Sequence, residues 1–226
     1  MEILSLILEI RFSKNASLIV DDKRQKLVEL IVGEPPKDKP PDAPKIGMVL
    51  NDSKTKTRIV VEENRIAISV EQPDIDKAKK RLVEILKIVY DQIGYKDLPV
   101  LRIGVRTQWV CPWNDSFTSL LNHFKNIFYT DNSLLKEASD VGIALTFNDG
   151  EAKVNYSCGP MKPTQGKTFL VFNDGQLPHD FTFIDVDRYK TEDQKTFDPT
   201  SIKMYITDSI SYEKSRAEET KNFLMS

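Results

Sequence analysis

The sequence predicts an α+β fold of two similar lobes, each an antiparallel β-sheet backed by a long α-helix. Segments with alternating apolar and polar residues come in runs, and a long segment with helical spacing ends each run. A doubly wound parallel fold would instead alternate strand and helix regularly. The predicted lobes are residues 1–112 and 113–226, or both halves form one continuous domain.

The first lobe opens with a strand, because residues 8–12 alternate between apolar and charged side chains. A helix is predicted from Asp21 or Asp22, either of which can cap it, to about Ile31, with Gly33 as its stop. Residues 34–45 are rich in proline and charge, which predicts an extended surface connection. A docking ligand for a proline-binding module is the alternative.

A meander of three strands is predicted next, at residues 46–50, 58–62 and 65–70. The strongest helix signal follows over residues 75–93, opened by Pro73 and Asp74 and ended by Gly94. A long strand, Leu98–Trp113, closes the lobe. Its apolar set, Leu101, Ile103, Val105, Thr107 and Trp109, occupies one face by the period of two.

The second lobe begins with a helix after Asn114 or Asp115, whose aromatic residues have the spacing of a core stripe. Residues 143–147 and 154–158 predict a hairpin around Asn148-Asp149-Gly150. A second strand pair is expected at 167–172 and 180–189, around a turn at 173–175. A short strand at 203–206 and a helix from Asp208 to about Leu224 complete the lobe.

Composition narrows the class of protein. The chain has 226 residues, a formal net charge of -2 and 40% hydrophobic residues, as expected for a globular protein with no overall attraction for nucleic acid. No apolar run approaches the ~20 residues that a membrane span needs. The apolar N-terminus lacks the basic start of a signal peptide and carries Glu2 and Glu9, so a strand and a cytoplasmic location are predicted.

Two arginines of the central strand form the first candidate site. Arg102 and Arg106 share the face opposite the apolar set, and Gly104 between them leaves room for close approach. The pair can bind a carboxylate or phosphate ligand, or it can form ion pairs with carboxylates of the same sheet.

Asp185 and Asp187 lie two apart on a predicted strand, so both project from one face, with His179 nearby. Such a pair can hold a divalent metal for phosphoryl transfer. The outer face of a sheet must also be polar, and Arg106 and Arg188 are available as partners. We therefore predict that the two aspartates are not a metal site. The segment 159–168 ends in Gly-Lys-Thr but has the wrong glycine spacing for a phosphate loop, and no cofactor is predicted.

A third candidate is an interaction surface made of Trp113, Lys162 and Lys167. Trp113 follows the end of the central strand, and the lysines belong to a segment flanked by glycine and proline that we expect to be mobile. Alternatively, Trp113 packs under the following helix against Phe117. Cys111 and Cys158 are predicted to be reduced, buried and inert, since the chain has only two histidines to act as a base.

Several segments of the chain together resemble an uncharacterised, sporadically distributed family of microbial proteins of about this size. The resemblance lies in Ile7–Phe12, Asn64–Val70 with the helix that follows, Leu101–Arg106 and Phe183–Asp187. It implies patchy inheritance, of the kind linked to mobile elements or defence loci. It implies no catalytic residues.

The sequence therefore favours a non-catalytic, cytoplasmic protein that binds a protein partner or regulates one. A small-molecule or anion-binding module using Arg102 and Arg106 is the second hypothesis. A metal-dependent hydrolase using Asp185 and Asp187 is the third, and the scarcity of histidine argues against it. The partner and the oligomeric state stay open.

Overall fold

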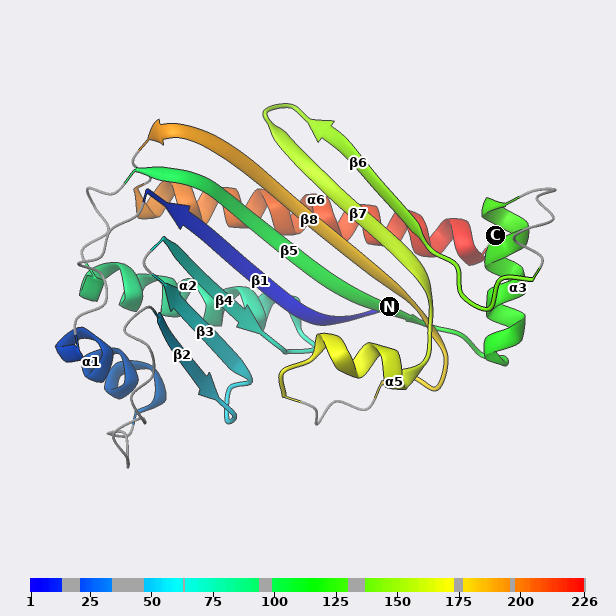
Figure 1. Cartoon of the computed structure of the whole chain (residues 1–226), viewed down its shortest axis with the longest axis horizontal. Helices are drawn as coiled ribbons and strands as arrows, with labels where there is room; N and C mark the ends of the chain where they lie inside the picture. Colours follow the sequence, from blue (N-terminus) through cyan, green and yellow to red (C-terminus); the bar gives the residue numbers. More distant parts are fainter. Residues whose placement is uncertain are drawn as a thin grey trace.

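A computed structural model describes residues 1–13, 21–33, 47–62, 64–93, 99–129, 137–172, 177–195 and 198–225. All of its strands belong to one antiparallel eight-stranded sheet with the order β2-β3-β4-β1-β5-β8-β7-β6 (Figure 1). The strands are β1 (Glu2–Phe12), β2 (Gly47–Asp52), β3 (Thr57–Glu62), β4 (Arg65–Val70), β5 (Val100–Pro112), β6 (Ile143–Asp149), β7 (Ala152–Met161) and β8 (Phe181–Lys195). The predicted α+β class with an antiparallel sheet is confirmed.

The two longest helices cross behind one face of this sheet, and shorter helices lie around its edges (Figure 1). The helices are α1 (Asp21–Val32), α2 (Ile75–Ile93), α3 (Phe117–Phe128), the short α5 (Pro163–Gly166) with the 3₁₀ turn η3 (Lys167–Phe169), and α6 (Pro199–Met225). α2 backs β4 and β1, and α6 backs β5 and β8. Each half of the chain thus contributes a long helix to the same side of a shared sheet.

β5 joins the two halves, as the long central strand signal suggested. It pairs with β1 on one side and with β8 on the other. One residue of its predicted apolar set is misplaced: Leu101 is 42% exposed, whereas Val100 is buried. The cause is a register shift between Val100 and Arg102, which turns Leu101 out of the alternation.

The core lies between the sheet and the long helices. Ala78, Leu82, Ile85 and Val89 of α2 are all fully buried, at the spacing that the sequence showed. Burying one Leu or Ile side chain contributes roughly 1.5–3 kcal/mol relative to leaving it in water. This spacing, rather than helix propensity, keeps α2 on the sheet.

The helix starts follow local hydrogen bonding. The Asp74 carboxylate accepts the backbone N–H groups of Asp76 and Lys77 at 3.0 and 3.1 Å, which caps α2 as predicted. The predicted cap of α3 at Asn114 or Asp115 is wrong. Ser116 caps this helix, and its hydroxyl accepts from the Ser119 N–H at 3.3 Å.

The expected strand at 167–172 is also wrong, because residues 163–169 form helical turns. Pro163 fixes the first turn of α5, where a missing N–H costs nothing. Gly166 packs so tightly on Phe181 that an added Cβ would lie 2.6 Å from the ring. Phe181 belongs to the sheet face opposite α2 and α6, where it joins Val110 and Phe183 in a small second core.

The expected strand at 203–206 is part of α6, which begins at Pro199 rather than at Asp208. Asp198 starts this helix by accepting the N–H groups of Thr200 and Ser201 at 2.8 and 3.0 Å. Buried Ile202, Tyr205 and Ile206 show that the segment follows helical spacing. The short apolar run fitted both patterns, and the sheet beneath it decided between them.

Some expectations lie outside the described residues, namely the proline-rich connection 34–45, the turn at 173–175 and the helix stop at Gly94. Within the described ranges, no helix is both long and apolar enough to cross a membrane. The division into lobes 1–112 and 113–226 stays a prediction, since the sheet runs unbroken from β5 into β8.

Candidate functional site

The predicted site residues of β5 and β8 meet on the sheet face that α2 and α6 leave open. The register places Gln108 opposite Asp185, Arg106 opposite Asp187, and Gly104 opposite Tyr189. The period of two therefore brings both arginines and both aspartates to one surface. We call Arg102, Arg106, Asp185 and Asp187 the charged band.

Arg106 and Asp185 form a two-pronged ion pair. The Arg106 Nε donates to Asp185 Oδ1 at 2.7 Å, and its terminal nitrogen donates to Oδ2. Asp185 is only 8% exposed, so the guanidinium compensates a carboxylate that is nearly out of water. The hydrogen bonds from Arg106 to Asp185 raise the pKa of Arg106 above its ordinary value.

Arg102 links two carboxylates across three strands. Its terminal nitrogens lie 2.5 Å from Glu9 Oε1 of β1 and 3.1 Å from Asp187 Oδ2 of β8. Its guanidinium also lies 4.4 Å from the centre of the Tyr189 ring. Burial nevertheless raises the pKa of Asp187, against the opposing effect of Arg102 and Arg106.

The space beside Gly104 is filled by the protein itself. An added Cβ would lie 3.2 Å from Tyr189 Cβ and 3.4 Å from Asp187 Oδ1. The missing side chain at Gly104 thus leaves room for Tyr189, Asp187 and Arg102. Both arginines are engaged by carboxylates, so an anionic ligand would have to displace those carboxylates.

A hollow of about 410 Å³ adjoins the charged band over β6 and β7, lined by Arg106, Asp185, Asp187, Asn155, Ser157 and Thr146. Arg106 is the more open member of its pair, with 41% of its side chain exposed. The hollow offers hydroxyl, amide and charged groups to a polar ligand.

Other expected partners of the aspartates lie elsewhere. Arg188 points to the helix-covered face, where its Nε donates to Asp149 at 2.7 Å. His179 is 2.8 Å from Asp180 and not part of the charged band. Within the described ranges, no three His, Cys, Asp or Glu residues are grouped as metal ligands.

Trp113 and Lys162 each contact α3, at different residues, whereas Lys167 belongs to η3. The Trp113 ring lies 5.0 Å from His123 of α3, and its Nε1 is buried without a hydrogen-bond partner in the described structure. Lys162 Nζ sits 4.7 Å from the Phe117 ring centre. Trp113 thus packs against α3, where its ring contacts His123.

Both cysteines are free and buried. Burial raises the pKa of Cys111 and of Cys158 above the ordinary thiol value. A raised pKa keeps the thiols protonated near neutral pH, which is the opposite of what a nucleophile requires.

A surface that sequence reasoning missed lies at the outer edge of β6. β6 is the last strand of the sheet, and no described segment pairs with its outer side. Residues Ile143–Asn148 carry no charge. A groove of about 310 Å³ runs beside this edge, lined by Leu145, Phe147, Phe223 and Arg216 among others. We call the outer side of β6 with this groove the β6 edge; its sequence signal was the uncharged run.

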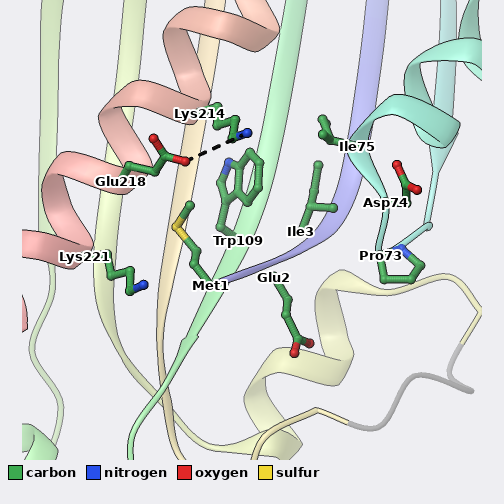
Figure 2. Close-up of a pocket in the computed structure, with 10 residues that line it drawn as sticks. All are labelled: Met1, Glu2, Ile3, Pro73, Asp74, Ile75, Trp109, Lys214, Glu218 and Lys221. Atoms are coloured by element: carbon green, nitrogen blue, oxygen red, sulfur yellow. Dashed lines mark ion pairs between the residues drawn. The ribbon is translucent and has the colours of Figure 1, made fainter.

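A further cleft, of about 430 Å³, opens between α6 and the start of α2. Figure 2 shows Trp109 and Ile3 at its base, Lys214, Glu218 and Lys221 along the α6 side, and Pro73, Asp74 and Ile75 on the α2 side. We call it the Trp109 cleft. None of its charged residues was predicted from the sequence to belong to a functional site.

Comparison with known proteins leaves the family open. No family model matches the chain, and no curated protein matches it. Among solved structures, one described as "Methanococcus jannaschii TBP" is similar at 10% identity, covering 99% of this chain and 97% of that chain, with a TM-score of 0.32.

Proposed function

We propose that this chain is a non-catalytic protein that binds an extended segment of a protein partner at the β6 edge. The observation that carries the proposal is an outer strand whose unpaired backbone groups lie beside an exposed apolar groove. Outer strands are normally protected from other chains by charge, proline or a covering segment. Among the described residues, the β6 edge has none of these along Ile143–Asn148.

The groove defines the chemistry of the segment. Leu145 and Phe223 are each 53% exposed, so apolar side chains of an added strand would remove this surface from water. Backbone hydrogen bonds to β6 would supply affinity, and alternate side chains entering the groove would supply specificity. Arg216 at the rim already pairs with Glu219 at 2.7 Å, so the segment needs no charge there.

The other outer strand provides a matched control. β2 also ends the sheet, but α1 lies beside it (Figure 1). Val49 of β2 is 50% exposed, close to the value for Leu145. A photoreactive amino acid placed at position 145 or at position 49 therefore compares two outer strands of similar exposure.

In cells, position 145 is expected to give one discrete crosslinked species, and position 49 none. The crosslinked protein, once purified, should slow amide hydrogen exchange in β6 but not in β2, and Phe223→Lys should abolish this protection. Equal crosslinking at the two positions, or a bound partner that leaves β6 exchange unchanged, would contradict the proposal. A product of twice the chain mass would identify the partner as a second copy.

Ligand binding at the hollow beside the charged band is the second candidate. It is favoured by the open side of Arg106 and by the neighbouring Asn155 and Ser157. The ion pairs of Arg102 and Arg106 weigh against an anion there, so a neutral hydroxylated ligand fits this hollow better.

A further inference from the structure

The Trp109 cleft has a rigid apolar base. Trp109 and Ile3 are each 4% exposed, and Ile75 lies beside them at the start of α2. The Trp109 Nε1 donates to the Thr107 hydroxyl at 2.9 Å, which fixes the indole and uses its only donor. The ring can therefore offer a ligand only apolar and π contacts. A volume of about 430 Å³ suits a small organic molecule.

Two lysines on one side of α6 border this base. Lys214 and Lys221 are two helical turns apart, so both face the cleft, and Figure 2 shows their ammonium groups directed toward Trp109 and Met1. Lys214 Nζ lies 3.9 Å from Glu218 Oε1, which is too long for a hydrogen bond, so this ion pair is loose.

Lys221 differs from Lys214 because it makes no ion pair or hydrogen bond within the described structure, although it is half-buried. The carboxylates around the cleft are not paired with Lys221. Asp74 accepts the backbone N–H groups that cap α2, and the Glu2 side chain points away from the cleft in Figure 2. A half-buried cation without a carboxylate, next to an apolar base, favours an anion.

We propose that the Trp109 cleft binds an organic monocarboxylate with a flat apolar body. The body lies against Trp109, Ile3 and Ile75, and the carboxylate meets the Lys221 ammonium group. A single negative charge fits better than a phosphate dianion, because the carboxylates of Asp74 and Glu218 border the same cleft. This site is separate from the β6 edge, and neither proposal requires the other.

The test uses three probes with the same ring, namely benzoate, benzamide and benzylamine. In protein labelled with 5-fluorotryptophan, the two ¹⁹F signals report Trp109 and Trp113 separately, without a substitution in the tested protein. Benzoate is expected to shift the Trp109 signal saturably and to leave Trp113 unchanged. Benzamide and benzylamine should bind about tenfold more weakly, since they lack the charged hydrogen bond to Lys221.

Lys221→Gln is expected to reduce benzoate binding to the level of benzamide. Lys203→Gln is the matched control, because Lys203 is an exposed lysine of the same helix outside the cleft. A thermal melt of each variant establishes that it is folded. Equal binding of benzoate and benzamide by the unsubstituted protein, or equal losses in the two variants, would overturn the proposal. Should Lys221→Gln not fold, the comparison of the three probes decides alone.

Discussion

The most informative single substitution is Glu213→Gln, because Glu213 carries a fully buried carboxyl group on the sheet-facing side of α6. Its Oε1 accepts the backbone N–H of Arg188 at 3.3 Å, and Thr107 also donates to it, whereas Oε2 has no partner in the described structure. Burial raises the pKa of Glu213 well above its ordinary value of 4.5. The folded protein therefore holds a proton that the unfolded chain releases.

The sign of the pH effect follows from this difference. The stability that depends on protonated Glu213 is fully present below pH 4.5, the unfolded value, and falls as pH rises toward the raised folded pKa. One proton of difference changes the unfolding free energy by at most about 1.4 kcal/mol per pH unit. Glutamine keeps the shape of the protonated acid and cannot ionise, so Glu213→Gln should remove this slope.

The assay is urea unfolding of both proteins at several pH values between 5 and 8. The stability of Glu213→Gln relative to the unsubstituted protein should increase with pH. Asp187, whose pKa is also raised by burial, is present in both proteins and cancels in the difference. Glu218→Gln, on the exposed side of the same helix, should leave the profile unchanged. Parallel profiles for Glu213→Gln and the unsubstituted protein would refute the reasoning.

Two further substitutions test the open face. Arg106→Gln leaves Asp185 nearly buried without its guanidinium, so urea unfolding should show a loss of about 2 kcal/mol, part of which the additional change Asp185→Asn restores. If the double variant lost as much unfolding free energy as Arg106→Gln alone, the ion-pair explanation would be contradicted. Gly166→Ala places a Cβ 2.6 Å from the Phe181 ring and should cost roughly 1–3 kcal/mol in the same assay, whereas Gly142→Ala, 3.4 Å from its nearest neighbour, should cost less. Equal losses of stability in the two variants would show that α5 can shift away from Phe181 at little energetic cost.

The sequence predicted those parts of the fold whose apolar residues follow one clear periodicity, either that of a helix or that of a strand. α2 and the β6–β7 hairpin follow from apolar spacing and from Gly150, which has a φ of 59°. Residues 167–172 and 203–206 were wrongly predicted to be strands, because short apolar runs fit a strand and a helix equally well. Their structure is decided by long-range packing, on Phe181 for the first and on the sheet beneath α6 for the second.

The candidate site was predictable to the same extent. Alternation along β5 and β8 placed both arginines and both aspartates on one face, but the choice of partners depends on register. Register pairs Arg102 with Glu9 of β1, a residue 93 positions away in the chain. The β6 edge and the Trp109 cleft depend on which strand is outermost and on where two helices diverge. No local pattern carries that information.

Residues that form ion pairs and residues that are exposed or unpaired should respond differently to substitution: the first should affect stability, and the second should affect binding. Every arginine and aspartate of the charged band is engaged, so substitutions there should change the free energy of unfolding. Leu145 is half-exposed, and Lys221 has no ion pair within the described ranges, so their replacement should leave stability nearly unchanged and affect binding. If Leu145→Lys or Lys221→Gln lowered stability as much as Arg106→Gln, the proposed binding surfaces would instead be part of the folded core.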